Sequence, residues 1–302
     1  MNRRDFVVSA AATLALPHLG RFARLREAEP KIRFAVKYGM VDEGATVLEK
    51  FKLVKELGFH GIEMDSPSNL DRSEVIAARD ETRLTIHGVV DSVHWRKPFS
   101  HPDAEVRAEG VAALETAVRD CKAYGGTTVL VVPAVVNKDV SYAEAWERST
   151  REIKRVLPLC EELGIRIAFE NVWNGFLLSP LEAARYVDSF ESSLVGWYFD
   201  VGNIVNYGWP RHWIEALGNR IFKVDVKGFS RKRRNDQGLW KGFGVEIGDE
   251  QDDGNWDEVR AALGKLGYDS WATAEVGGGG RERLADIKAR MDRVLANPLS
   301  AK

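Results

Sequence analysis

Residues 166–203, RIAFENVWNGFLLSPLEAARYVDSFESSLVGWYFDVGN, contain a complete strand–helix–strand pattern. A short apolar run, 166–169, is followed by an amphipathic stretch, 179–190, and then by a second apolar run, 195–199. Short apolar runs rich in β-branched or aromatic residues are typical of buried parallel strands, and the stretch between them is typical of a connecting helix. We therefore predict two parallel strands joined by a helix.

The same alternation continues in both directions along the chain. The other predicted strands are 32–37, 61–64, 84–87, 128–132, 221–226 and 271–274. The other predicted helices are 46–57, 103–124, 141–163, 210–217, 255–266 and 281–295, and Pro158 should kink or break the third of these. Residues 227–254 read as a long charged loop.

Eight strands alternating with helices predict an α/β fold, a single (β/α)₈ TIM barrel, over residues 31–302. A doubly wound open sheet is the competing fold. It should carry a glycine-rich phosphate loop after its first strand, and residues 36–40, VKYGM, do not form one. No linker rich in Pro, Gly or Ser divides this part of the chain, so we expect one domain.

Composition excludes several classes of protein without indicating a function. The 302 residues include 43 basic and 45 acidic side chains, so no basic excess favours binding to nucleic acid. The hydrophobic content of 44% is typical of a globular chain rather than a fibrous, disordered or integral-membrane one. Two cysteines, Cys121 and Cys160, lie in separate predicted helices and cannot form a disulfide framework.

Residues 1–30 differ from the rest of the chain. Arg3 and Arg4 precede a short, moderately apolar run that is too short to span a bilayer. This pattern resembles a twin-arginine (Tat) export signal followed by a linker. We therefore expect export by the twin-arginine route to the periplasm, with no stable membrane association afterwards. The alternative is a basic N-terminus or an uncleaved anchor.

Acidic residues occur at the ends of four successive predicted strands. They are Glu170, Asp200, Asp225 and Glu275. The C-terminal ends of barrel strands meet at one rim, so we expect the four carboxylates to converge. Close carboxylates repel one another unless a cation lies among them, and an all-oxygen set suits Mn²⁺ or Mg²⁺. A helix N-cap or a loop carboxylate is the alternative for any one acid alone.

Three motifs around these acids resemble the xylose isomerase-like barrel superfamily. They are Phe169-Glu170-Asn171, FDVGN at 199–203, and Ala274-Glu275. Within the superfamily the chain is most similar to the sugar phosphate isomerase/epimerase group, which includes ketose 3-epimerases and hydroxypyruvate isomerases. The resemblance covers about residues 31–294. It implies one divalent metal bound by the four strand-end residues. It also implies that Glu170 and Glu275 exchange the proton beside the substrate's carbonyl.

The chain departs from the family pattern in the seventh predicted strand. The family reads His-x-Lys-Asp there, whereas residues 225–228 read DVKG. Asp225 takes the place of the histidine and can still bind a metal. Because four carboxylates make a harder site, we expect Mn²⁺ or Mg²⁺ in preference to Co²⁺ or Zn²⁺. Lys227 matches the family lysine and would neutralise part of the cluster.

Further residues are candidates for contact with substrate. His87 ends the third predicted strand and would point into the barrel mouth, where it would bind a substrate hydroxyl or assist proton transfer. The alternative is that it only supports its neighbours. Glu63, at the end of the second, would bind a sugar hydroxyl or have a buried structural role. Trp173 follows Glu170 closely and could stack on a sugar ring, although nine tryptophans make chance placement an alternative. Asn203 and Lys227 complete this set.

These residues predict a divalent-metal-dependent sugar isomerase or epimerase. We expect an unphosphorylated or keto sugar as the substrate, because phosphorylated sugars are scarce outside the cytoplasm. A lyase or hydratase acting on 3-keto sugars, glycosides or inositols stays open, because it would begin with the same proton abstraction. A non-catalytic sugar-binding barrel also stays open. The expected partner is a small carbohydrate, not nucleic acid. A homodimer and a homotetramer are both compatible with the sequence.

Overall fold

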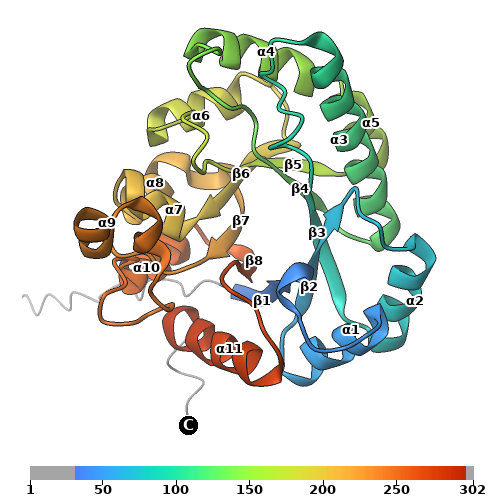
Figure 1. The fold of residues 1–302 in the computed structure, drawn as a ribbon, viewed down its shortest axis with the longest axis vertical. Helices are drawn as coiled ribbons and strands as arrows, with labels where there is room; N and C mark the ends of the chain where they lie inside the picture. Colours follow the sequence, from blue (N-terminus) through green and yellow to red (C-terminus); the bar gives the residue numbers. More distant parts are fainter. Residues whose placement is uncertain (1–30, 297–302) are drawn as a thin grey trace, which may run out of the picture.

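Eight parallel strands pair in sequence order, and β1 pairs with β8 to close the barrel (Figure 1). The computed structural model describes residues 31–296. The predicted export signal, residues 1–30, lies outside the described residues. The strands are β1 (Lys31–Lys37), β2 (Gly61–Ser66), β3 (Thr85–Asp91), β4 (Thr128–Val131), β5 (Arg166–Phe169), β6 (Val195–Asp200), β7 (Ile221–Val226) and β8 (Asp269–Ala274). The predicted single TIM barrel is confirmed.

Helices surround the strands (Figure 1). They are α1 (Val47–Glu56), α2 (Arg72–Thr82), α3 (Ala104–Tyr124), α4 (Tyr142–Lys154), α5 (Leu157–Leu163), α6 (Pro180–Asp188), α7 (Val201–Tyr207), α8 (Pro210–Leu217), α9 (Arg231–Gln237), α10 (Trp256–Lys265) and α11 (Arg281–Leu295), with 3₁₀ turns η1 (Tyr38–Met40), η2 (Gly218–Arg220) and η3 (Leu239–Phe243). Thr46 and Glu49 form a capping box at the start of α1. Gly125 ends α3 in the left-handed conformation that favours glycine.

Three differences from the sequence-based expectation have local causes. Helices α2 and α7 were not predicted: only Val75 and Ala78 are buried along α2, so its apolar stripe is too narrow to recognise, and α7 begins directly after β6 with no turn between them. The helix predicted over 141–163 is divided into α4 and α5, and Pro158 lies in the first turn of α5, where proline is tolerated. The segment expected to be a loop, 227–254, contains α9 and η3.

Strands β2 and β3 extend past their predicted ends. The third strand was predicted to end at His87, but it continues through Gly88 to Asp91. The second strand likewise ends at Ser66 rather than at residue 64. His87 and Glu63 therefore lie within their strands rather than at the barrel rim. This displacement decides where both side chains lie in the candidate site.

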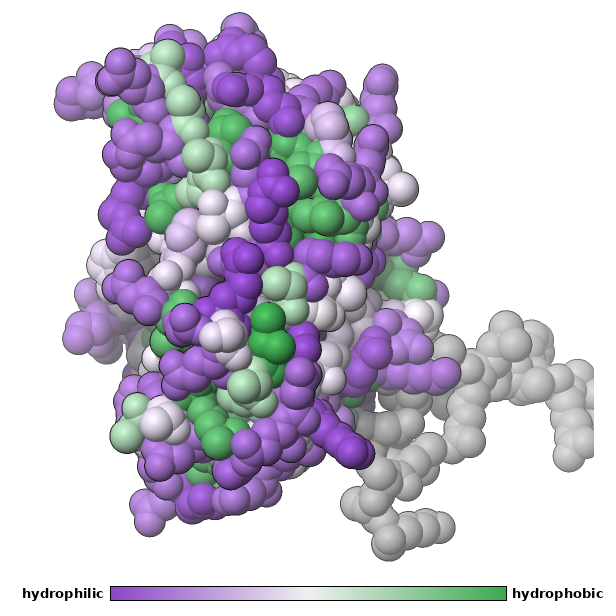
Figure 2. All heavy atoms as spheres, turned by 90° about the vertical axis from the view of Figure 1, so that its right-hand side faces the viewer, coloured by the Kyte–Doolittle hydropathy of each residue, from purple (hydrophilic) through white to green (hydrophobic). Residues whose placement is uncertain are grey.

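The buried apolar residues form two clusters, one around the outside of the strands and one in the barrel interior. The larger one combines strand residues such as Val36 with helix residues such as Phe51 and Leu114, so it lies between the barrel and its helices. The smaller one contains only strand residues, namely Leu130, Ala168 and Tyr198, with Val90 and Phe222 packed against them. The face drawn in Figure 2 is largely hydrophilic, with smaller separate apolar groups.

Two further expectations concern the described residues 31–296. None of their helices is long and apolar enough to cross a membrane. Cys121 and Cys160, the two cysteines of the sequence, are free and buried. Burial raises the pKa of the Cys121 thiol to about 11, so this thiol stays protonated at neutral pH.

Candidate active site

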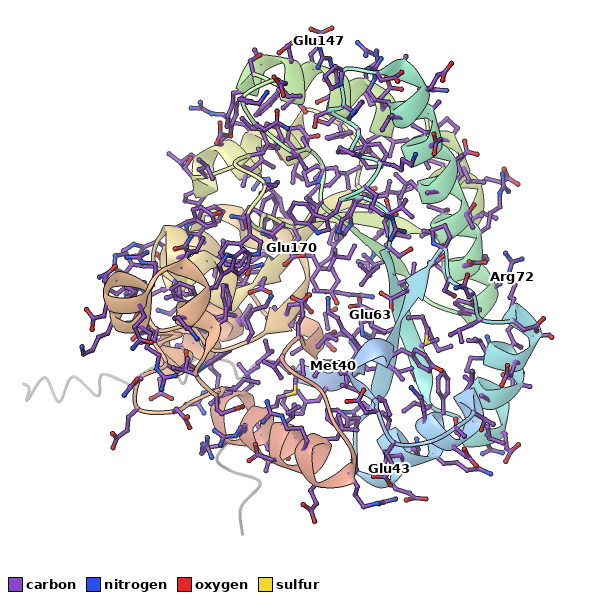
Figure 3. All side chains as sticks on the ribbon, in the orientation of Figure 1. Met40, Glu43, Glu63, Arg72, Glu147 and Glu170 are labelled. Carbon is purple, nitrogen blue, oxygen red and sulfur yellow. The ribbon has the colours of Figure 1, made fainter. Side chains whose placement is uncertain are left out.

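The four predicted carboxylates converge at the C-terminal ends of the strands. One oxygen from each of Glu170, Asp200, Asp225 and Glu275 lies within 4.8 Å of the corresponding oxygens of the others. We call these four residues the carboxylate cluster. Register explains part of the convergence, because Asp200 on β6 pairs directly with Asp225 on β7. Glu170 is drawn inside the ring of strands, whereas the labelled Glu147 lies at the outer edge (Figure 3).

Backbone and side-chain hydrogen bonds fix the individual members. The Glu170 amide donates to the carbonyl of Val131, which continues the β4–β5 pairing past the end of β5. Asp200 caps α7 by accepting from the Asn203 amide at 2.7 Å. The side chain of Asn203 donates to Glu170 Oε1 at 2.8 Å. Asn203, predicted to contact substrate, therefore orients a member of the cluster in this structure.

Two lysines pair with the cluster. Lys227 Nζ lies 2.9 Å from Asp200 Oδ2 and 2.5 Å from Glu275 Oε2, as expected for a residue that offsets the negative charge. Lys37, at the end of β1, lies 3.0 Å from Asp225 Oδ2 and 3.1 Å from Glu275 Oε1. Lys37 was not predicted, although its place at a strand end is the same signal that identified the acids.

Burial and charge give the two glutamates of the cluster opposite protonation preferences. Burial raises the pKa of Glu170 well above its usual range, and the charges of Glu275 and Asp200 add to this rise. Burial acts to raise the pKa of Glu275 as well, but Lys227 and Lys37 outweigh it and hold that pKa below its usual range. The pKa values of the two glutamates are therefore shifted in opposite directions, although both groups are buried in the same cluster.

Glu63 belongs to the same neighbourhood but is deeply buried. Its Oε2 lies 3.5 Å from Lys37 Nζ, and its Oε1 accepts a hydrogen bond from the Tyr198 hydroxyl at 2.8 Å. Glu63 was considered either as a residue that binds a sugar hydroxyl or as a buried structural residue, and these contacts favour the structural role. Counting Glu63, five carboxylates face two lysines, which leaves an excess of negative charge when all five are ionised.

His87 lies deeper in the barrel than the carboxylate cluster, which differs from its predicted position at the mouth. Its Nδ1 lies 2.8 Å from Lys223 Nζ, and its Nε2 lies 3.1 Å from the Thr273 hydroxyl. The ring stacks on Trp271, with 4.8 Å between centroids. Burial and the charge of Lys223 lower the pKa of His87 well below its usual range, so the ring is neutral. These contacts agree with the alternative that His87 supports its neighbours in the barrel rather than contacting substrate.

A cavity of about 510 Å³ borders Glu275 and Lys227. Trp173 lines it, so this tryptophan does lie beside the cluster as predicted. Trp240 and Phe243, from η3, line the same cavity, and their ring centroids lie 4.8 Å and 4.7 Å from that of Trp173. Both were missed, because they lie in a segment with no helical or strand periodicity.

The carboxylate cluster fits a divalent cation. Its four oxygens converge, and three of the four residues are buried, while Glu275 is partly exposed. Asp225 Oδ1 is buried without a hydrogen-bond partner among the described residues. An unpartnered buried carboxylate oxygen is costly, and a bound cation would satisfy it. Carboxylate oxygens are ligands that Mg²⁺ and Mn²⁺ accept.

The fold and this site define the class of protein. A family model described as the xylose isomerase-like TIM barrel matches residues 51–295. The chain belongs to this family.

Curated relatives match part of the chain. L-ribulose-5-phosphate 3-epimerase UlaE of Escherichia coli O1:K1 / APEC is 27% identical over 176 residues, which cover 53% of this chain and 61% of that protein. The match therefore spans about three fifths of the relative's length.

Solved structures match over most of the chain. A D-tagatose 3-epimerase-like protein has a TM-score of 0.75 at 18% identity, covering 89% of this chain and 100% of that one. The apo form of 3-keto-D-glucoside 4-epimerase, YcjR, from E. coli has a TM-score of 0.71 at 15% identity, covering 87% of this chain and 99% of that one. At such identities the likeness shows a shared fold.

Proposed function

We propose that this chain is a sugar epimerase that moves a proton at the carbon beside a carbonyl group. The observation that carries the proposal is the pair formed by Glu170 and Glu275. Their carboxylates belong to one cluster at the C-terminal strand ends, where Asn203 orients Glu170 and Lys227 pairs with Glu275. Two carboxylates that can act as acid and base on the two faces of one carbon are what epimerisation by proton exchange requires. The epimerase names of the relatives agree with this reaction class.

Different residues of the chain carry out the separate steps of the proposed reaction. Glu275 accepts the proton from carbon, and Glu170 returns a proton to the opposite face, so the mass of the sugar stays constant. Asn203 holds Glu170 Oε1 in place, and Lys227 holds Glu275 ionised. A divalent cation bound by the carboxylate cluster would supply Lewis-acid polarisation of the carbonyl.

An unphosphorylated keto sugar suits the cavity best. Two described cations, Lys227 and Arg283, line it, and each already pairs with a carboxylate. Arg283 Nη1 lies 2.9 Å from Glu246 Oε2. A phosphate group would have to displace one of these ion pairs. The hydroxyl groups of a sugar can instead bind to the paired side chains without breaking them.

We also propose that the protein acts after export by the twin-arginine route. The support is the sequence of residues 1–30, with Arg3 and Arg4 ahead of an apolar run. Replacing both arginines by lysine should trap the protein in the cytoplasm of a host with this pathway. Periplasmic fractionation with an antibody checks it, and unchanged export of the double variant would contradict the proposal.

Deuterium exchange tests the proposed reaction. The protein is incubated with Mn²⁺ in deuterated water with free, phosphorylated and 3-keto sugars, and products are followed by NMR and mass spectrometry. We expect one deuterium at the carbon beside the carbonyl and an epimer whose mass differs from that of its substrate only by that isotope. Loss or gain of water, or release of an aglycone, would instead assign a lyase or hydratase. Binding without exchange would assign a sugar-binding protein.

A further inference from the structure

The cavity beside the carboxylate cluster extends well beyond the groups that carry the chemistry. Glu275 and Lys227 lie on one part of its lining, and Trp240, Glu246 and Arg283 line the rest. Its volume of about 510 Å³ lies within the range of about 300–1,000 Å³ that is usual for pockets binding drug-sized ligands. This lining offers contacts to a ligand that reaches beyond the reacting carbons.

One wall of this cavity is aromatic. We call Trp173, Trp240 and Phe243 the aromatic wall. Trp240 is 67% exposed, the largest value among the exposed large hydrophobic residues of the described chain. Leaving so large an apolar side chain in water costs free energy, which burial against a ligand would recover. Because the C–H faces of pyranose rings are apolar, a sugar ring is a suitable ligand for it.

The aromatic wall is held in place by the fold. Phe243 packs on buried Phe229, with 4.7 Å between ring centroids. A Cβ on Gly242 would lie 2.6 Å from the Phe229 ring, so only glycine lets η3 approach this closely. The Ser230 amide donates to the Gly242 carbonyl at 2.7 Å. Trp240 is thus presented from a fixed backbone, which lowers the entropic cost of stacking on a ligand.

The cavity also carries polar groups suited to hydroxyls. Arg283 donates from Nε to the Gly277 carbonyl at 3.0 Å and from Nη1 to Glu246 Oε2 at 2.9 Å. Glu246 is partly exposed, so its carboxylate can accept further hydrogen bonds. An aromatic face combined with a paired arginine and carboxylate is the lining expected for a sugar ring rather than for a purely apolar group.

We propose that this cavity is a second sugar subsite and that the substrate is a keto-glycoside of two rings. The inference rests on the proposed function. The reacting ring lies at Glu170 and Glu275, and the second ring stacks on Trp240 with its hydroxyls at Glu246 and Arg283. The aromatic wall therefore selects a glycoside over a free monosaccharide.

Binding of unreactive sugars tests the subsite separately from the chemistry. Calorimetric titration compares glucose with maltose and cellobiose on wild type, Trp240→Ala and Trp240→Phe. We expect wild type to bind one of the disaccharides about fivefold more tightly than glucose, since one stacking contact contributes roughly 1 kcal/mol. Trp240→Ala should lose that preference, and Trp240→Phe should keep part of it. Trp209→Ala is the matched control, because Trp209 is also exposed but does not line this cavity.

The outcomes separate the two proposals. Equal affinity for one and two rings in wild type, or a Trp240→Ala variant that still prefers disaccharide, overturns the subsite. Exchange rates on a keto-monosaccharide and a keto-disaccharide then form the second arm. If neither exchanges deuterium while the disaccharide preference depends on Trp240, the reaction is wrong and the subsite stands. If both exchange equally well and Trp240→Ala changes neither, the reaction stands and the subsite is wrong.

Discussion

The barrel interior contains two polar layers that are built in opposite ways. The upper layer, at the C-terminal strand ends, consists of the carboxylate cluster with Glu63, Lys37 and Lys227. The lower layer consists of Lys223, His87, Thr273 and Tyr198. Lys223 and Asp225 belong to the same strand and lie only two residues apart. The two layers are therefore adjacent along the strands, and they differ in which side chains they contain.

The two layers differ in whether their buried polar groups have hydrogen-bond partners. In the lower layer both ring nitrogens of His87 have a partner, and the hydroxyls of Thr273 and Tyr198 bond to each other at 3.1 Å. In the upper layer Asp225 Oδ1 has none among the described residues, and carboxylates outnumber lysines. Satisfied buried polar groups stabilise a fold, whereas unsatisfied ones persist at functional sites. We infer that the lower layer supports the barrel and the upper layer performs the chemistry.

The largest expected effect is on proton exchange in the upper layer. Glu170→Gln and Glu275→Gln should each lower the deuterium exchange rate about 10²–10⁴-fold, the usual contribution of a general acid or base. Glu147→Gln is the control, because Glu147 is 77% exposed on the outside of the barrel. Either variant exchanging at the wild-type rate would contradict the assigned roles.

The second largest expected effect is on metal affinity, which should fall in variants of the upper layer and much less in variants of the lower layer. Asp225→Asn removes a charge and replaces one of the two carboxylate oxygens by an amide nitrogen, so we expect Mn²⁺ binding to weaken about 100-fold. Electron paramagnetic resonance of free Mn²⁺ measures the titration. Thr273→Val alters the strand partner of Asp225, but the Thr273 hydroxyl bonds to His87 and Tyr198, so this variant should weaken Mn²⁺ binding much less than Asp225→Asn does. Equal losses in both variants would mean that the layers are not separate.

Stability should depend on the lower layer. Thr273→Val conserves volume but removes the hydroxyl that bonds to His87 and Tyr198. We expect the free energy of unfolding to fall by about 1–3 kcal/mol, because buried groups lose a partner. Urea unfolding followed by circular dichroism measures it. A variant as stable as wild type would show that this network does not support the barrel.

The smallest expected effect concerns a buried acid outside both layers. Burial raises the pKa of Asp91 from 3.8 to about 7. The hydrogen bond that Asp91 accepts from the Val93 amide lowers this pKa, but by less than burial raises it. Because the folded-state pKa is raised, the protein loses stability as the pH rises from about 4 to 7. Asp91→Asn should therefore raise the melting temperature at pH 8 by a few degrees and much less at pH 5. A gain that does not depend on pH would contradict this assignment.

The sequence predicted the barrel and the four-carboxylate cluster because both depend on local patterns that repeat along the chain. It did not predict the partners that complete the site. Lys37 pairs with acids from β7 and β8, which only barrel closure brings near it. His87 was placed at the mouth because Gly88 resembles a strand end, yet the strand continues. Trp240 comes from a segment without periodicity, so its place beside Trp173 depends on tertiary packing.

The most direct test of the division between layers is the unfolding free energy of Glu170→Gln, measured at pH 8 in the presence of a chelator. Burial raises the pKa of Glu170, so its ionised form destabilises the fold at this pH. Glutamine keeps the acceptor for Asn203 and removes the charge. We predict a variant that is at least as stable as wild type under these conditions and that has lost proton exchange when assayed with Mn²⁺. A loss of more than about 1 kcal/mol would contradict the account, since it would make Glu170 a structural residue.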